Sequence, residues 1–206
     1  ILATVLSKSD PRVSGYLTFP LPENTTLKRP LNRNLDIPIP AIDLGNGKTW
    51  RNQIKRVYPD LEWEGVHHPG NSSGVVDGAA AVLIASEAYT KKHNLKPRGR
   101  IVAYSNLGDC PTLMLNAPVP GALKALAKAG LEVADIDLWE INEAFAVVAE
   151  KFIRDLGLDR AKVNVNGGAM ALGHPIGATG AILVGTILDE LERTGGRYGL
   201  VTMCAG

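Results

Sequence analysis

Cysteine is scarce in this chain of 206 residues, which contains two, Cys110 and Cys204. Cysteines this far apart fit neither a disulfide framework nor the paired spacing of a zinc site, so the sequence predicts no bound metal. A reducing compartment is the natural setting for so few thiols. We therefore expect a cytoplasmic protein, or one of an organellar matrix if the source is eukaryotic.

An excess of charge and long apolar runs are lacking as well. The formal net charge is +1 and no basic tract stands out, so there is no electrostatic reason to expect nucleic acid as a partner. No apolar run approaches the roughly 20 residues that a membrane-spanning helix needs, and the first residues lack the basic flank of a secretory signal. With 45% hydrophobic and 21% charged residues, the composition is that of an ordinary globular domain.

Regular patterns are lacking over residues 1–65, because prolines interrupt nearly every candidate element. Residues 36–43 are a candidate edge strand, and Gly45-Asn46-Gly47 is a turn signal. We expect residues 1–65 to be an irregular segment, a loop or a region that covers a partner domain. Residues 66–206 form the regular domain in this interpretation.

Strand and helix patterns alternate strictly from residue 80 onward, which indicates a layered α/β domain with helices covering a sheet. Alternation alone would favour an all-parallel sheet. Strands are predicted at residues 80–85, 99–105, 136–141, 163–166 and 198–204. Helices are predicted after Ser86, from Pro120 to Gly130 with Leu123, Leu126 and Ala127 inward, over residues 143–156, and from about residue 176.

The stretch from Asn164 to Gly180 combines a short strand, a glycine-rich turn, one histidine and a helix start. His174 lies at the helix entrance, where free backbone N–H groups and the helix dipole favour neutral imidazole over imidazolium. A neutral imidazole can accept a proton. Alternatively, Gly173-His174-Pro175 is only a tight turn whose ring caps a neighbouring carbonyl, and a lone histidine does not decide between the two.

Three further stretches bear on that choice: Asn71 to Ala81, Ile141-Asn-Glu-Ala-Phe-Ala146 and Met203-Cys-Ala-Gly206. Together with the histidine turn, these four ordered motifs resemble the signatures of the C-terminal half of thiolases, over roughly residues 66–206. The resemblance implies a layered αβαβα fold of which this chain supplies mainly the C-terminal half. It also implies a mixed five-stranded sheet with helices on both faces, in place of the all-parallel sheet.

Thiolases move an acyl group between coenzyme A and either another coenzyme A or the α-carbon of an acyl-CoA. By the resemblance, His174 activates the nucleophilic cysteine and helps bind the thioester oxyanion, and Cys204 is the acid/base at the α-carbon. Asn142 holds a water that, with His174, donates to the enolate oxygen. The alternatives are a buried strand cysteine at 204 and an N-cap at 142.

The same resemblance implies a pantetheine contact for Ser73, which is otherwise a turn or cap residue. Phe145 and Gly173 would belong to the coenzyme A and substrate site, although Phe145 also suits a core position. Coenzyme A and acyl-CoA are then substrates, and no cofactor is bound permanently. Thiolases are dimers or tetramers, so we expect a homodimer or homotetramer.

The main departure from the family is the nucleophile. Cys110 lies in Gly108-Asp-Cys-Pro111, where the family places none, and the paired His67 and His68 lack a carboxylate or cysteine that would complete a metal site. Two functions follow as hypotheses. The chain is part of a thiolase, catalytic only together with a nucleophile-bearing half, or it is a coenzyme A-binding or scaffold protein without turnover. A β-ketoacyl synthase ranks low, since those enzymes generally pair two histidines with the nucleophile.

Overall fold

The computed structural model describes residues 2–8, 56, 59–60, 67, 69–109 and 115–204. It forms two compact units, one of residues 1–15 and 73–206 and the other of residues 16–72. The second unit contains a 3-10 turn, η2 (Pro69–Asn71). The candidate edge strand at 36–43, the turn at 45–47 and Cys110 lie outside the described residues. The elements below all belong to the first unit.

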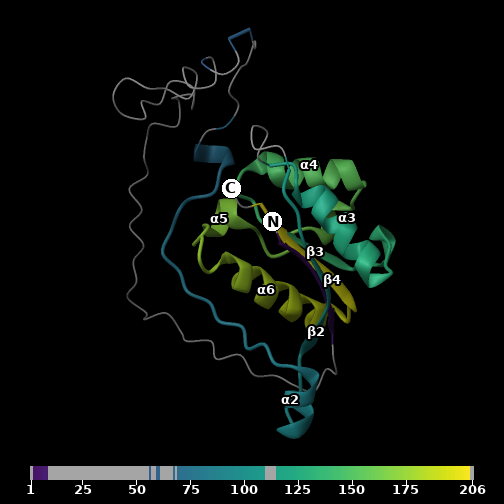
Figure 1. Ribbon diagram of the computed structural model, residues 1–206. Coiled ribbons are helices and arrows are strands. Elements are labelled where there is room, and N and C mark those ends of the chain that lie inside the picture. The colour runs from purple at the N-terminus through teal and green to yellow at the C-terminus, as the bar shows by residue number, and fades with distance from the viewer. Residues whose placement is uncertain are drawn as a thin grey trace. The chain divides into compact units, whose positions relative to one another are not determined.

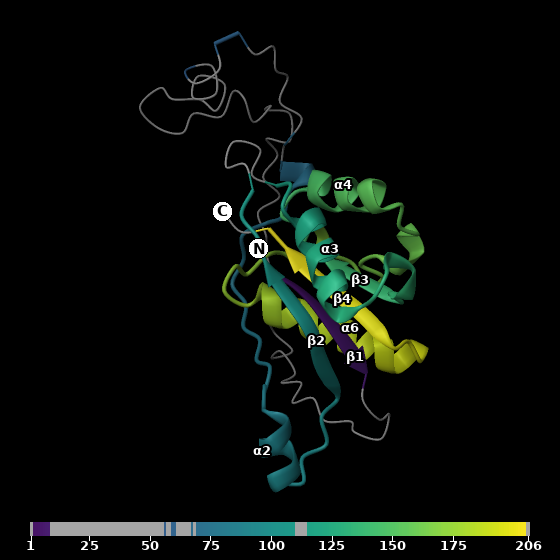
Figure 2. The ribbon, with the colours of Figure 1, turned by 45° about the vertical axis from the view of Figure 1, so that its right-hand side comes forward.

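The sheet has four strands: β1 (Leu2–Lys8), β2 (Gly99–Asn106), β3 (Leu138–Ile141) and β4 (Tyr198–Met203). Their order is β2-β1-β4-β3, as Figures 1 and 2 show. β1 is antiparallel to both neighbours, whereas β3 and β4 are parallel with Ile141 opposite Thr202. The predicted mixed sheet is therefore confirmed, and β1 is a strand that the sequence pattern did not predict.

The prediction of five strands is wrong, because two of the predicted strands do not form in the described chain. Residues 80–85, predicted as a buried strand, are extended but pair with no strand and are exposed. Residues 163–166 are reduced to one bridge between Val163 and Trp139, and Val165 is exposed. The physical reason is local, because Asn164 adopts a positive φ of 46°, which turns the chain out of the sheet after a single pair.

Two helices, α3 (Pro118–Ala129) and α4 (Ala146–Leu156), cover one face of the sheet. Their core includes Phe152, which contacts Trp139 edge to face at 5.7 Å between ring centres. The buried residues of this cluster are Ala122, Ala125, Leu126, Ile136, Trp139, Ile141, Val148, Ala149, Phe152, Val163 and Leu200. The predicted apolar face of α4 is confirmed, but the helix begins at Ala146 and not at residue 143.

The prediction for α3 is wrong in its start and its face. The helix begins at Pro118 and ends, as predicted, at Gly130, whose φ is 67°. Leu123 and Ala127 are exposed, and the contact with the sheet uses Ala122 and Ala125 beside Leu126. Small side chains let the helix approach the strands closely, so the alanines rather than Leu123 face the core.

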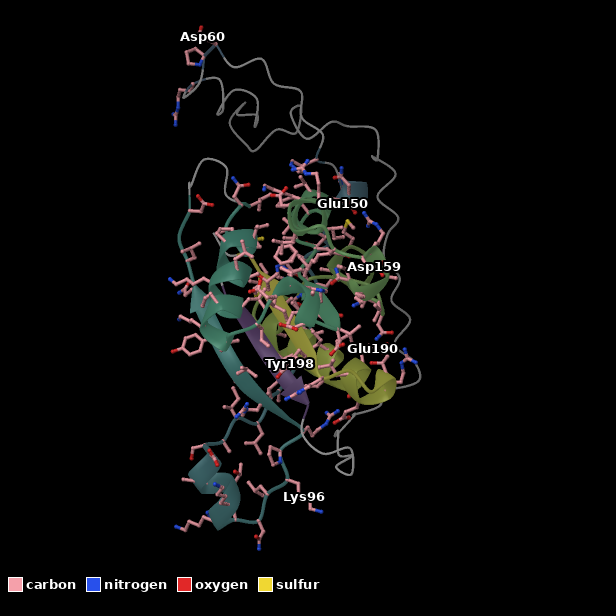
Figure 3. All side chains as sticks on the ribbon, turned by 90° about the vertical axis from the view of Figure 1, so that its right-hand side faces the viewer. Asp60, Lys96, Glu150, Asp159, Glu190 and Tyr198 are labelled. Atoms are coloured by element: carbon pink, nitrogen blue, oxygen red, sulfur yellow. The ribbon has the colours of Figure 1, made fainter. Side chains whose placement is uncertain are left out.

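The helix α6 (Thr179–Thr194) covers the opposite face, which confirms helices on both faces. Its buried residues Leu183, Ile187 and Leu191 pack on Leu138 and Val201. Successive residues of a strand point to opposite faces, so Leu138 and Val201 contact α6 while their neighbours in β3 and β4 contact α3 and α4. Figure 3 labels Glu190 on α6 and Tyr198 at the start of β4.

The remaining elements are short: α2 (Glu87–Lys92), η3 (Val133–Asp135), η4 (Arg160–Lys162) and α5 (Ala169–Leu172). Ser86 caps α2 by accepting a hydrogen bond of 3.1 Å from the Tyr89 amide, as predicted. Figures 1 and 2 show α2 beyond the start of β2, apart from the helices that cover the sheet. α5 lies in the middle of the glycine-rich stretch and was not predicted.

Candidate functional site

The ends of β3 and β4 place two of the predicted site residues. Asn142 directly follows β3, and Cys204 directly follows β4. The Asn142 amide donates to the Thr202 carbonyl at 3.0 Å, which continues the parallel ladder past the end of β3. Because parallel strands end at the same edge of a sheet, Asn142 and Cys204 both leave the sheet at that edge.

His174 joins this edge from the glycine-rich stretch. Its backbone amide donates to the Gly74 carbonyl at 2.8 Å, and its ring contacts one residue with each nitrogen. Nε2 lies 3.3 Å from Asn142 Nδ2, and Nδ1 lies 2.6 Å from Thr179 Oγ1. The structure thus brings together His174 and Asn142, which belong to two different sequence motifs.

Burial favours the neutral form of the His174 ring. Burial lowers the pKa of His174, because the charged imidazolium loses more hydration than the neutral ring. A neutral base was expected from a helix entrance, but α6 begins five residues later, at Thr179. Burial is thus the cause that the structure supports, and the link to the helix runs through the Thr179 side chain.

Asn142 is not the N-cap that local sequence suggested as an alternative. The N-cap of α4 is Phe145, and no side chain makes a cap hydrogen bond there. Asn142 is fully buried, and its Oδ1 has no hydrogen-bond partner within the described part of the chain. A buried amide oxygen without a partner is costly, so it marks a place where a donor is wanted.

Glu143, which the sequence pattern did not single out, fastens the loop after β3 to the glycine-rich stretch. Its carboxylate accepts from Asn164 Nδ2 at 2.9 Å and from the Met170 amide at 3.1 Å. A Cβ at Gly168 would lie 2.1 Å from the carboxyl carbon of Glu143, so a side chain there would push the carboxylate out of these contacts. The pair Gly167-Gly168 was the one signal of this close approach in the sequence.

Asn164 completes the connection through the backbone of β3. Its Oδ1 accepts from the Ile141 amide at 2.7 Å, and its Nδ2 donates to the Ile141 carbonyl at 2.9 Å. The side chain therefore takes the place of a neighbouring strand beside the residue that precedes Asn142. This contact fixes the position of Asn142 relative to the stretch that carries His174.

Residues 73–78 pack against the histidine turn from another side, with an isolated parallel bridge between Val75 and His174. Gly173 has a φ of 95°, and a Cβ there would lie 2.5 Å from Val76 Cγ2. A Cβ at Gly78 would lie 2.7 Å from Pro175 Cγ. Both glycines are thus required by close packing, which gives Gly173 a structural role beside its predicted place in the substrate site.

Ser73 and Phe145 lie near each other in the same region. Ser73 contacts the Ala144 carbonyl with both its amide, at 3.0 Å, and its Oγ, at 3.1 Å. Phe145 is half-buried and packs against the core on the α3 and α4 face. The predicted contacts of Ser73, Phe145 and Gly173 with coenzyme A stay predictions.

Cys204 is a half-buried free thiol at the end of β4, packed against the same core. Burial raises the pKa of the Cys204 thiol above its ordinary value, because the thiolate would lose hydration. Cys204 therefore carries its proton at neutral pH and is able to donate it. In contrast to the alternative of a buried strand cysteine, residue 204 follows the last residue of β4 and is half-buried.

Other surfaces of the described chain carry less chemistry. A hollow of about 450 Å³ on α4 is lined by Val147, Glu150, Lys151, Ile153, Arg154 and Arg160, away from His174. Its cations are paired with Glu150 and Asp155. Within the described ranges, no cluster of histidine, cysteine and carboxylate side chains could hold a metal, and no helix is long and apolar enough to cross a membrane.

The mixed sheet is covered on both faces by helices, and His174 contacts the buried Asn142 where β3 and β4 end. These features define a layered α/β domain with a histidine–asparagine pair at one edge of its sheet. Residues 95–206, more than half of the chain, match the family model of the thiolase C-terminal domain. The chain belongs to the thiolase family.

Similar proteins agree with this assignment. The acetyl-CoA acetyltransferase of Shinella zoogloeoides is 44% identical over 174 residues, which cover 84% of this chain and 44% of that protein. A steroid 3-ketoacyl-CoA thiolase of Mycobacterium tuberculosis is 56% identical over 135 residues, or 66% of this chain and 33% of the relative. The chain thus spans less than half the length of these relatives.

The fold is similar to that of a solved thiolase. The crystal structure of human mitochondrial 3-ketoacyl-CoA thiolase in complex with CoA gives a TM-score of 0.62 at 43% identity. The match covers 78% of this chain and 41% of the human chain. The layered α/β domain described above is therefore the C-terminal domain fold of the family.

Proposed function

We propose that this chain serves thiolase-type acyl transfer, the reversible cleavage of 3-ketoacyl-CoA by coenzyme A or the reverse condensation of acetyl-CoA units. One observation supports this function above the others. Two motifs that lie 32 residues apart in sequence meet through the 3.3 Å contact between Asn142 Nδ2 and His174 Nε2. Family membership, with acetyltransferases and 3-ketoacyl-CoA thiolases among the relatives, supports the same chemistry.

His174 is the general base in this proposal. Its neutral ring accepts the proton of the nucleophilic thiol, and the resulting thiolate attacks the carbonyl carbon of the acyl donor. An acyl-enzyme forms as the bond from that carbon to the leaving group breaks, which releases the acetyl-CoA enolate in cleavage or the coenzyme A thiolate in condensation. The protonated Nε2 then donates a hydrogen bond to the thioester oxyanion. The lowered pKa of His174 supports the first step, since a charged ring could not accept a proton.

Asn142 stabilises the enolate together with His174 in the proposed mechanism. Its Oδ1 is buried and has no partner among the described atoms, which suits a water that donates one hydrogen to Oδ1. The second hydrogen of that water is then free to point at the enolate oxygen. This stabilisation acts where negative charge develops in the transition state.

Cys204 is the proposed acid/base at the α-carbon. In cleavage it donates its proton to the carbanion carbon of the departing acetyl-CoA enolate. In condensation it first donates its proton to the departing coenzyme A thiolate, and the Cys204 thiolate left behind then removes a methyl proton of the second acetyl-CoA. The raised pKa of the half-buried thiol keeps it protonated and ready for the first of these steps.

The nucleophile is the part of the mechanism that this chain does not supply. Cys110 matches no position at which the family places its nucleophile, and Cys204 has the acid/base role. We therefore propose that residues 1–206 alone do not turn over, and that a nucleophilic cysteine comes from a second half on the same or another polypeptide. Ser73, Phe145 and Gly173 line the coenzyme A and substrate site, and the working assembly is a homodimer or homotetramer.

A coenzyme A-binding protein without turnover is the second candidate, because neither of the two cysteines matches the nucleophile. The test uses the native polypeptide, meaning the complete natural chain that contains these residues. Its intact mass is measured together with its thiolysis of acetoacetyl-CoA by coenzyme A. A mass near twice 21.9 kDa with turnover supports a thiolase, and a mass of 21.9 kDa without turnover supports the binding protein.

Two variants of the native polypeptide separate the catalytic roles. His174→Ala is expected to lower formation of labelled acyl-enzyme by a factor on the order of 10² to 10⁴, the range that general bases supply. Cys204→Ser should still form acyl-enzyme but lose carbon–carbon bond formation. Unchanged acylation by the first variant, or normal condensation by the second, would remove that residue from the mechanism.

A further inference from the structure

Thr179, the first residue of α6, makes two contacts with one hydroxyl group. Its side chain is buried, with 3% of its surface exposed. Oγ1 lies 2.9 Å from the Pro175 carbonyl oxygen and 2.6 Å from His174 Nδ1. A threonine hydroxyl has one hydrogen to donate and two lone pairs that accept.

The hydrogen positions follow from what each partner is able to do. A carbonyl oxygen only accepts, so the single hydroxyl hydrogen of Thr179 points at Pro175. Toward His174 the hydroxyl must then accept, and Nδ1 must carry a proton. A neutral imidazole has one N–H, so Nε2 holds the lone pair, which also suits the Asn142 amide nitrogen as its donor.

We propose that Thr179 is a positioning residue that holds His174 as the Nδ1–H tautomer and so presents a basic Nε2 beside Asn142. Its consequence for catalysis rests on the proposed function. A base that takes the thiol proton on Nε2 must leave that nitrogen unprotonated beforehand. A ring held in the other tautomer would place its hydrogen where the proton has to arrive, and such a ring is inactive as a base.

The same helix offers a control for the loss of a threonine side-chain hydrogen bond to the helix backbone. Thr194 Oγ1 donates to the Glu190 carbonyl four residues before it at 2.7 Å, the same spacing as Thr179 and Pro175. Thr194 has no histidine contact among the described interactions. Thr194→Val therefore removes the same kind of bond without touching His174.

The direct test is a long-range proton–nitrogen correlation spectrum of the histidine rings in the 206-residue chain. The four histidines are assigned with a His174→Asn variant. We expect the Nδ1–H tautomer for His174 in the wild type, in Thr179→Ser, which keeps the hydroxyl, and in Thr194→Val. Thr179→Val should shift the ring to Nε2–H or to a mixture.

Two results would overturn the proposal. One is an Nε2–H tautomer in the wild type, which does not depend on any variant folding. The other is an unchanged Nδ1–H signal in Thr179→Val, which would show that something other than the hydroxyl holds the ring.

The kinetic test uses the native polypeptide. Thr179→Val is expected to lower kcat by about tenfold to a hundredfold, the cost of losing a buried hydrogen bond to the base, while KM changes far less. Thr179→Ser should restore most of the rate, and the limb of the pH profile that reports the base should move in Thr179→Val alone. A wild-type polypeptide without turnover would contradict the proposed function and leave the tautomer result standing. A Thr179→Val enzyme with wild-type kcat and pH profile would contradict the positioning role.

Discussion

Residues 73–78 contact the loop that carries His174 through Gly74, Val76 and Gly78, although the Val75 side chain is exposed. Residues 79–85, which continue the same stretch, are extended and exposed. In the first part, the Gly74 carbonyl accepts a hydrogen bond from the His174 amide, and the Val76 side chain fills the space that a side chain at position 173 would need. In the second part, Leu83 is 90% exposed and Ile84 is 71% exposed. Figures 1 and 2 show the second part as an extended trace leading to α2.

The two parts differ in where their partners lie. The glycine-rich part meets its partners inside this domain, so its conformation is determined by groups present in the described chain. The apolar part has the composition of a buried strand but pairs with no described strand. An apolar segment is stabilised by burial, but its sequence alone does not show which strand it pairs with.

The first prediction breaks the packed part at Gly173. Gly173→Ala places a Cβ on Val76 and forces alanine into a φ of 95°, so we expect a loss of about 3 kcal/mol of unfolding free energy. Gly130→Ala is the matched control. Gly130 also has a positive φ, of 67°, but a Cβ there would meet no neighbouring atom within 4 Å. Its expected cost is about 1 kcal/mol. Equal losses for the two variants in urea denaturation would show that packing by Val76 does not matter.

Sequence pattern predicted the elements whose signals are local. Ser86 caps α2, Gly130 ends α3, and the apolar face of α4 is placed correctly because caps, glycine stops and helical periodicity act within a few residues. It missed β1, whose pairing depends on strands that lie about 100 and 200 residues away in the chain. It also misjudged α3, because the sheet selected its alanine face.

Within the site, motifs located His174 and Asn142, but they did not show how the two are held. The contacts of Thr179, Glu143 and Asn164 are hydrogen bonds between side chains and distant or buried groups. A threonine at a helix start or a glutamate after a strand is common in any sequence. These residues were therefore indistinguishable from ordinary helix and loop positions until the fold was known.

The second prediction concerns Glu140, a buried residue of β3 that precedes the loop of Asn142. Burial, with the nearby carboxylates of Glu143 and Glu190, raises the pKa of Glu140 from 4.5 to about 8. Glu190 is itself paired with Arg193, which lowers the pKa of Glu190 to about 2. Between pH 4.5 and about 8, Glu140 is therefore protonated in the folded state but ionised in the unfolded chain.

Because the folded-state pKa is the higher one, stability should fall as pH rises from about 4.5 to about 8 and then level off. The total fall is about 5 kcal/mol. Glu140→Gln removes this dependence and should be the more stable protein at pH 8, as urea denaturation at several pH values would show. Glu150→Gln, an exposed change on α4, should keep the wild-type fall. A variant Glu140→Gln with the same fall as the wild type would rule out Glu140 as its source.

The smallest effect is expected in the exposed part, at Leu83. Leu83→Ala should change the unfolding free energy of the 206-residue chain by less than about 0.5 kcal/mol, because the side chain loses almost no burial. The matched control is Leu126→Ala in α3, where the side chain is 3% exposed and the same change should cost about 2 to 5 kcal/mol. If Leu83→Ala cost as much as Leu126→Ala, residues 79–85 would be buried in solution, and the contrast between the two parts of the stretch would be wrong. Repeating the pair in the native polypeptide sharpens the contrast, since a strand that covers Leu83 there would raise its cost toward that of Leu126.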